Sequence, residues 1–121
     1  VILIAERNPH IRNLVQRELM AEDYHVFTVD NVFQLKNWIY LRRAPDILVL
    51  DPELPGSEEH NIWGLLASYP ELPVIIHCLC ADQWKDLNGL KLSALVEKNG
   101  NSINFLKHQI MRIDSEYCRG N

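Results

Sequence analysis

Five short apolar runs recur along the chain, each of the length of one buried strand. They occupy residues 1–5, 25–29, 46–50, 73–78 and 93–97. Three of them are nearly continuous in aliphatic residues, which is typical of strands that are covered on both faces. Helical stretches separate them. Strands that alternate with helices predict a parallel sheet with right-handed crossovers, and therefore a doubly wound α/β domain.

Helix-start signals support this alternation. Asn8 and Pro9 supply an N-cap and a first-turn proline for one helix. The other expected N-caps are Asn31, Ser57 and Ser102, and a short helix weakened by Gly89 is expected within 82–91. The side chains expected to face inward are Ile11, Leu14, Val15, Leu19, Leu35, Trp38, Ile39, Ile62, Leu65, Leu66, Tyr69, Ile103, Leu106, Ile110 and Ile113.

Composition narrows the class of protein. The chain has 121 residues, enough for one domain, and a net charge of −4 that argues against direct nucleic-acid binding. No apolar run approaches the roughly 18–20 residues of a membrane span, so we expect a soluble, cytoplasmic domain. It is expected to cover residues 1–113, with 114–121 as a tail or the start of a linker to an output domain.

The cysteines indicate a reducing compartment, because three is an odd number without framework spacing. Two of them lie in the segment HCLC, residues 77–80. Residues on a strand alternate faces, however, and no second ligand pair has zinc spacing elsewhere. We therefore interpret Cys78 and Cys80 as buried strand residues rather than metal ligands.

Chemically active groups follow the expected strands. Glu6 and Arg7 come after the first, Asp51 after the third, Cys78 ends the fourth and Lys98 follows the fifth. The carboxyl ends of parallel strands meet at one edge of the sheet, where ligands of such folds gather. The sequence therefore predicts two carboxylates, a guanidinium and an ammonium on one rim.

Four stretches make the chain resemble a response-regulator receiver domain, the phosphoacceptor module of two-component signalling. They are NPHIRNLVQREL (8–19), PDILVLD (45–51) with Pro55-Gly56 in the following loop, ELPVII (71–76) and ALVEK (94–98). The resemblance covers residues 1–113 and implies a flavodoxin-like, five-stranded parallel sheet of order 2-1-3-4-5. It also implies that Asp51 accepts a phosphoryl group and that Lys98 pairs with the acyl phosphate.

The same resemblance implies a Mg²⁺ ion, held by an acidic pair after the first strand, by Asp51 and by the backbone carbonyl of Glu53. Here the acidic pair is Glu6-Arg7, and a positive charge beside Mg²⁺ should weaken or abolish metal binding. Arg7 could instead pair with Asp51, neutralise a phosphoryl group directly, or point into solvent.

Other departures from the family lie in the same site. Cys78 occupies the Ser/Thr position and is a poor hydrogen-bond donor, and Leu79 replaces a small residue. Leu95 stands at the switch aromatic, and Asn99 replaces the proline after Lys98. The resemblance therefore implies a receiver fold with a degraded or rewired site.

Two regulatory functions remain open. The first is a phosphoacceptor domain that receives its phosphoryl group from a histidine kinase or phosphotransfer protein. Such a domain is regulatory, and its only activities would be self-phosphorylation from a donor and autodephosphorylation. It would signal to an output domain through the face of the fourth helix, fifth strand and fifth helix, where Trp84 lies. The second is a pseudo-receiver that mediates protein–protein contacts or homodimerisation without phosphorylation. A flavin carrier is disfavoured, because no glycine-rich or Ser/Thr-rich phosphate loop is present.

Overall fold

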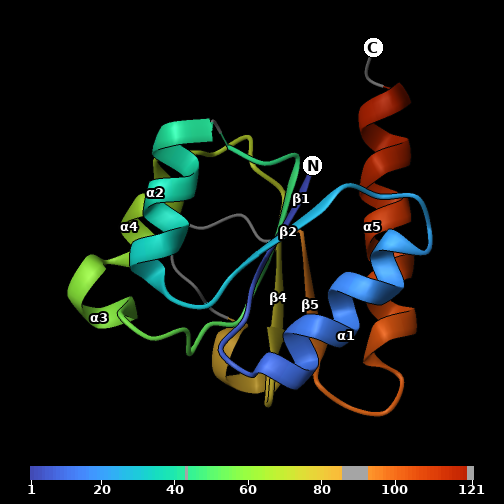
Figure 1. The fold of residues 1–121 in the computed structure, drawn as a ribbon, viewed down its shortest axis with the longest axis horizontal. Helices are drawn as coiled ribbons and strands as arrows, with labels where there is room; N and C mark the ends of the chain where they lie inside the picture. The colour runs from blue at the N-terminus through green and yellow to red at the C-terminus, as the bar shows by residue number, and fades with distance from the viewer. Residues whose placement is uncertain (43, 86–92, 120–121) are drawn as a thin grey trace.

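The computed structural model describes residues 1–42, 44–85 and 93–119. Five parallel strands form one sheet of order β2-β1-β3-β4-β5 (Figure 1). The strands are β1 (Ile2–Ala5), β2 (Val26–Val29), β3 (Ile47–Leu50), β4 (Val74–Cys78) and β5 (Ala94–Glu97). The predicted doubly wound sheet and its strand order are confirmed.

Helices cover both faces of this sheet (Figure 1). They are α1 (Pro9–Met20), α2 (Val32–Arg42), α3 (Ser57–His60), α4 (Ile62–Ala67) and α5 (Ser102–Arg119), with a 3-10 turn, η1 (Ala81–Trp84), before β5. The N-cap of α1 is confirmed, since Asn8 Oδ1 accepts hydrogen bonds from the amides of His10 and Ile11 at 2.9 and 3.2 Å. Asn31 caps α2 through the amide of Gln34 at 2.8 Å.

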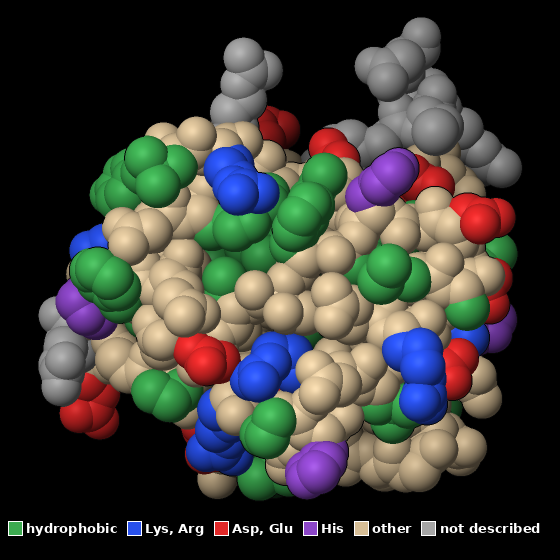
Figure 2. Space-filling view, in the orientation of Figure 1, with side chains coloured by type: hydrophobic (Ala, Val, Ile, Leu, Met, Phe, Trp, Pro, Cys, Tyr) green, Lys and Arg blue, Asp and Glu red, His purple; other side chains and the backbone are tan. Residues whose placement is uncertain are grey.

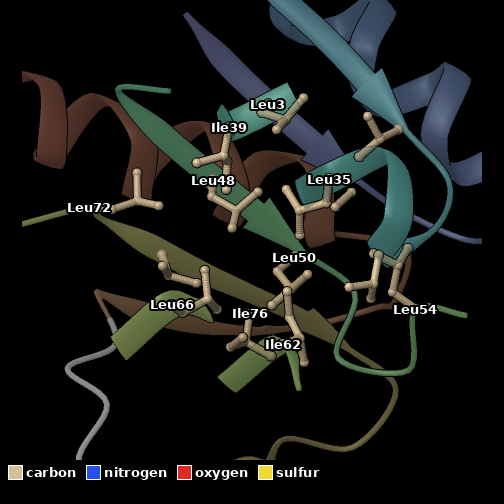
Figure 3. Close-up of a cluster of buried hydrophobic side chains, with 14 of the residues drawn as sticks. Leu3, Leu35, Ile39, Leu48, Leu50, Leu54, Ile62, Leu66, Leu72 and Ile76 are labelled. Atoms are coloured by element: carbon tan, nitrogen blue, oxygen red, sulfur yellow. The ribbon is translucent and has the colours of Figure 1, made fainter. Parts of the chain in front are cut away.

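The core has two halves because alternate strand residues point to opposite faces of the sheet. The half under α2 and α4 contains Leu3, Leu35, Ile39, Leu48, Leu50, Ile62, Leu66 and Ile76 (Figure 3). The half under α1 and α5 contains Ile2, Ile4, Val15, Leu19, Val49, Ile75, Leu106, Ile110 and Ile113. Burial on both faces explains why the strands read as continuous aliphatic runs.

Three helix predictions need correction. The helix expected after Ser57 is two helices, because Asn61 adopts a left-handed backbone with φ of 48° and caps α4 through the amide of Gly64. Ser57 is the first residue of α3 rather than its cap, which is Gly56 with φ of 91°. Ser102 likewise begins α5, and its amide donates to the carbonyl of Asn99.

Leu14, the segment 82–91 and the region after residue 113 remain to be compared with the sequence predictions. Leu14 is 39% exposed, because α1 packs through its neighbour Val15 and through Leu19, and Leu14 points away from them. Of the helix expected within 82–91, the turn η1 covers the beginning, and residues 86–92 lie outside the described residues. Helix α5 continues past residue 113 to Arg119, while the start of a linker there remains a prediction.

The surface mixes apolar side chains with charges of both signs on the face shown in Figure 2. Along the free edge of the sheet, the Phe27 ring of β2 packs against Trp38 at 6.0 Å between centroids, and the Arg42 guanidinium lies 5.7 Å from the same ring. Among the described residues, no helix is both long enough and apolar enough to cross a bilayer.

The two faces of α2 predict opposite effects of the same substitution. Leu35→Ala should lower the free energy of unfolding by roughly 2–5 kcal/mol, because Leu35 is fully buried. Leu41→Ala is the matched control and should change it by less than about 0.5 kcal/mol, since Leu41 is 83% exposed. Urea unfolding of the two variants measures both values, and equal losses would contradict this packing of α2.

Candidate functional site

Asp51 follows β3 directly and is held at the carboxyl edge of the sheet. Its amide still bonds within the sheet, to the carbonyl of Ala5 at 2.8 Å. Its Oδ1 accepts a hydrogen bond from the amide of Glu53 at 3.0 Å, and its Oδ2 faces the amide of Arg7 at 3.3 Å. The side chain is only 2% exposed. A buried carboxylate needs positive partners, so the neighbouring charges decide what it can do.

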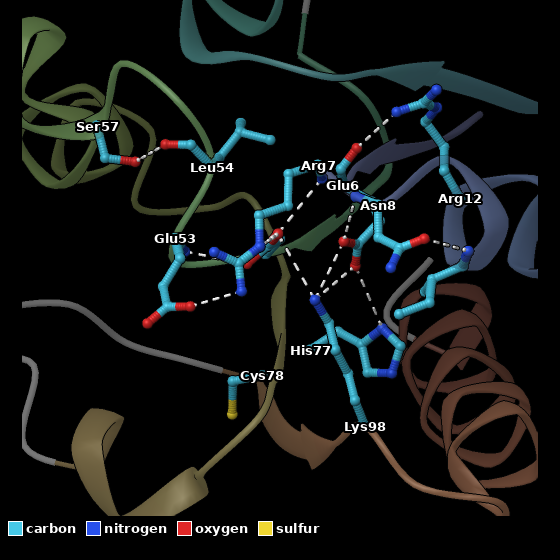
Figure 4. A network of polar contacts seen from close by, with 12 residues as sticks. Glu6, Arg7, Asn8, Arg12, Glu53, Leu54, Ser57, His77, Cys78 and Lys98 are labelled. Carbon is cyan, nitrogen blue, oxygen red and sulfur yellow. Dashed lines mark hydrogen bonds and ion pairs between the residues drawn. The ribbon is translucent and has the colours of Figure 1, made fainter.

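Two cations contact Asp51, and Figure 4 shows both of them, Arg7 beside Glu53 and Lys98 beside Glu6. Arg7 Nε lies 3.3 Å and Lys98 Nζ 3.5 Å from its Oδ2. Arg7 also reaches outward, because its Nη2 lies 2.6 Å from Oε2 of Glu53. The guanidinium therefore bridges the buried Asp51 and the more exposed Glu53. Of the three positions left open for Arg7 by the sequence, the structure shows the pairing with Asp51.

Glu6 is the second buried carboxylate of the site. Lys98 Nζ lies 2.9 and 3.0 Å from its two carboxylate oxygens, and the Asn8 amide donates to Oε2 at 3.0 Å. Burial raises the pKa of the Glu6 carboxyl, and the bond from Asn8 and the Lys98 ammonium offset this only in part. Glu6, Arg7, Asp51 and Lys98 are thus brought together, as the strand ends predicted.

His77 also belongs to this site, and sequence reasoning missed it. Leu50 pairs with Ile76 in the β3–β4 register, so the next residues, Asp51 and His77, are neighbours. His77 Nδ1 lies 3.9 Å from Oε1 of Glu6, while Nε2 has no hydrogen-bond partner in the described part of the chain. Burial, helped by the charge of Lys98, lowers the pKa of His77 to about 4, so the ring is neutral at pH 7. The sequence signal that could have identified His77 is its position as a polar residue within the aliphatic run PVIIHC.

Cys78 is not directed at Asp51. Its thiol lies in the core half under α2 and α4, 3.9 Å from the carbonyl of Val96, and Figure 4 shows it pointing away from the carboxylates. Burial raises the pKa of this thiol. The interpretation of Cys80 as a buried strand residue was wrong, because β4 ends at Cys78 and Cys80 is exposed ahead of η1.

Three other residues that differ from the receiver-family pattern, Leu79, Leu95 and Asn99, lie around the carboxyl edge of the sheet. Leu79 is 64% exposed, and Leu95 packs partly buried against the core half under α2 and α4. The side chain of Asn99 accepts a hydrogen bond from the amide of Asn101 at 2.8 Å. Trp84 packs against Trp63 with ring centroids 5.8 Å apart, and both are partly buried against the core half under α2 and α4.

The donor set does not fit Mg²⁺. In the described ranges, no group of three Asp, Glu, His or Cys side chains is arranged to hold a metal ion. The carboxylates expected to bind it are already paired, Glu6 with Lys98 and Asp51 with Arg7. The Glu53 side chain also binds Arg7, so a positive group lies among the expected ligands. A guanidinium there repels a divalent cation.

Comparison with known proteins shows the fold. No family model and no curated protein matches the chain. Solved structures do: a sensor protein from Polaromonas sp. JS666 is 22% identical with a TM-score of 0.80, covering 94% of this chain and 95% of that one. The response regulator TrrA from Thermotoga maritima, solved in complex with Mg(2+)-BeF, is 24% identical with a TM-score of 0.79, covering 93% and 96%.

A third neighbour is the signal receiver domain of a putative Luxo repressor protein from Vibrio parahaemolyticus. It is 19% identical with a TM-score of 0.77, and the match covers 99% of this chain and 96% of that one. The chain therefore has the fold of response-regulator receiver domains, as its sequence motifs predicted. Its site differs from the one that the family resemblance implies at Arg7 and Cys78.

The buried histidine predicts acid sensitivity. The unfolded chain protonates His77 near pH 6.5 but the folded chain only near pH 4, so acidification across this window favours unfolding. His77 should contribute a loss of about 1.4 kcal/mol per pH unit there. The raised pKa of Glu6 acts in the opposite direction, so the informative quantity is the difference between wild type and His77→Leu. Urea unfolding from pH 7 to 5 measures it, and equal pH dependence in both would contradict the burial of His77.

Lys98 should be essential for stability because it neutralises a buried carboxylate. Lys98→Met leaves Glu6 without its ammonium partner and should cost roughly 3–5 kcal/mol at pH 7. Lys107→Met is the control, since Lys107 pairs with Glu18 and Glu22 at the surface, and its loss should be much smaller. Thermal and urea unfolding compare the two, and similar losses would contradict the pairing.

Proposed function

We propose that the chain is a signal-transduction receiver domain in which Asp51 accepts a phosphoryl group from a histidine kinase or phosphotransfer protein. One observation carries the proposal: a buried aspartate at the carboxyl end of β3 has two cations, Arg7 Nε and Lys98 Nζ, within 3.3 and 3.5 Å of one oxygen. Attack on a phosphoryl group brings negative charges together, and fixed cations lower that cost. The fold shared with receiver domains supports the same function.

The proposed transfer is a displacement at phosphorus. One carboxylate oxygen of Asp51 forms a bond to phosphorus, and the bond from phosphorus to the donor breaks, with its electron pair leaving on the donor. Hydrolysis of the resulting acyl phosphate by water restores the carboxylate. The domain is regulatory under this proposal, with no turnover beyond self-phosphorylation and autodephosphorylation.

Access to Asp51 runs past Arg7. Asp51 is 2% exposed, whereas the Arg7 side chain is 38% exposed and its partner Glu53 is 44% exposed. A donor therefore reaches the carboxylate when the guanidinium moves outward. This movement breaks the exposed pair between Arg7 and Glu53, which contributes only about 0–1 kcal/mol to stability. It also breaks the contact of Arg7 Nε with the buried Asp51, which then keeps Lys98 as its cation.

The proposed output runs through the face of the predicted fourth helix, β5 and α5, to an output domain, a partner protein or a second copy of the chain; residues 86–92 of that helix lie outside the described residues. On α5, Phe105 and Met111 are exposed apolar side chains, which suit a protein contact. We place the domain in the cytoplasm, because the free cysteines Cys78 and Cys80 suit a reducing compartment.

Intact mass after incubation with acetyl phosphate and Mg²⁺ tests the proposal. Wild type should gain one phosphoryl group on Asp51. Asp51→Asn should gain none, because an amide lacks the nucleophilic oxygen. Asp46→Asn is the matched control: it removes an exposed carboxylate just before the opposite end of β3 and should leave the adduct unchanged.

The same experiment separates the pseudo-receiver alternative. The guanidinium that bridges Asp51 and Glu53 already neutralises the acceptor, which is the feature that favours a domain working without phosphorylation. An adduct that persists in Asp51→Asn, or none in wild type and in Arg7→Asp, would contradict the phosphoacceptor proposal. The pseudo-receiver then predicts a binding partner or dimer that is insensitive to Asp51→Asn.

A further inference from the structure

We propose that Arg7 takes the place of the metal ion in this site, so that phosphoryl transfer to Asp51 proceeds with side-chain cations alone. This inference rests on the proposed function and specifies which cations the phosphoryl transfer requires. The class of ligand is a tetrahedral phosphoryl anion, held between the guanidinium of Arg7 and the ammonium of Lys98.

The backbone holds Arg7 in position before any ligand arrives. The amide of Glu6 donates to the carbonyl of Val29 at 3.1 Å, which fixes the end of β1. The amide of Arg7 then lies 3.3 Å from Oδ2 of Asp51, and its Nε lies 3.3 Å from the same oxygen. Main chain and side chain therefore direct donors at one carboxylate oxygen.

Lys98 and Arg7 differ in how strongly their charges are used by buried carboxylates. Lys98 Nζ lies 2.9 and 3.0 Å from Glu6 but 3.5 Å from Asp51, so most of its charge neutralises the buried Glu6. Arg7 binds Asp51 and the half-exposed Glu53. Arg7 can therefore move from the carboxylates to an incoming phosphoryl group, because Lys98 remains paired with the buried Glu6.

Guanidinium chemistry suits that exchange. Its planar fork of N–H donors matches phosphate oxygens in pairs, and such charge-assisted bonds are among the stronger ones in proteins. Nε and Nη2 now contact one oxygen of Asp51 and one of Glu53. On phosphorylation both donors can turn to phosphoryl oxygens, while Glu53 is released into solvent.

A divalent ion would have to undo this arrangement. It would need to displace the guanidinium from both Asp51 and Glu53 and to compete with Lys98 for Glu6. Mg²⁺ demands near-octahedral oxygen geometry and gives up its water reluctantly. With a fixed positive charge among the ligands, the protein gains nothing from exchanging Arg7 for the ion.

The first test measures metal binding without any phosphodonor. Mg²⁺ is titrated into ¹⁵N-labelled protein while the amide signals of Asp51 and Glu53 are followed. Wild type should show no shift that saturates within the titrated range. Arg7→Asp should saturate at a Mg²⁺ concentration at least about tenfold below the end of that range, because a repulsive charge becomes an attractive one. Arg17→Asp makes the same charge change near the far end of α1 and should behave as wild type. Saturable binding of Mg²⁺ by wild type at these amides overturns the inference.

The second test compares the rate of adduct formation from acetyl phosphate in EDTA and in Mg²⁺. Wild type should react at the same rate within about twofold, and Arg7→Gln should be at least about tenfold slower in EDTA. Adduct that forms only with Mg²⁺ overturns the inference while the proposed function stands. If no adduct forms under either condition in wild type or in Arg7→Asp, the proposed function fails, and the metal titration still decides whether Arg7 excludes the ion.

Discussion

Neutralisation of two buried carboxylates at one edge of an apolar sheet is the constraint on which the site depends. Glu6 and Asp51 are each 2% exposed, and an unpaired charge at such a depth costs several kcal/mol. Lys98 lies within ion-pair distance of both, so one ammonium from the end of β5 links the ends of β1 and β3. Folding and the proposed chemistry therefore depend on the same three side chains, and loss of this lysine would leave the buried Glu6 without its cation.

Strand order explains why the fourth strand contributes an uncharged ring. Lys98 reaches from β5 past β4 to groups on β3 and β1, so His77 lies close to the path of its side chain. A protonated imidazole there would add a second positive charge beside the ammonium. Burial and Lys98 keep His77 neutral instead, and the balance of charge in the pocket stays close to even without it.

Most of the fold could be predicted from the sequence because burial on both faces makes parallel strands readable as aliphatic runs. The caps Asn8 and Asn31 were equally readable, since their amide–carboxamide bonds are local. The break at Asn61 was not, because apolar spacing continues through a residue whose backbone turns left-handed. In the site, strand ends placed Glu6, Asp51 and Lys98 together, but the direction of the Arg7 side chain depends on tertiary partners that spacing does not encode.

The stack of Trp38, Phe27 and Arg42 at the β2 edge has a consequence for assembly. A free edge strand is a template on which further strands can add, and natural proteins protect such edges with charge and bulk. Here the exposed Arg42 guanidinium lies 5.7 Å from the centre of the Phe27 ring on the edge strand, so a bulky side chain and a positive charge both stand at this edge. Charge and bulk of this kind disfavour the addition of a further strand, so the β2 edge is a poor template for edge-to-edge aggregation.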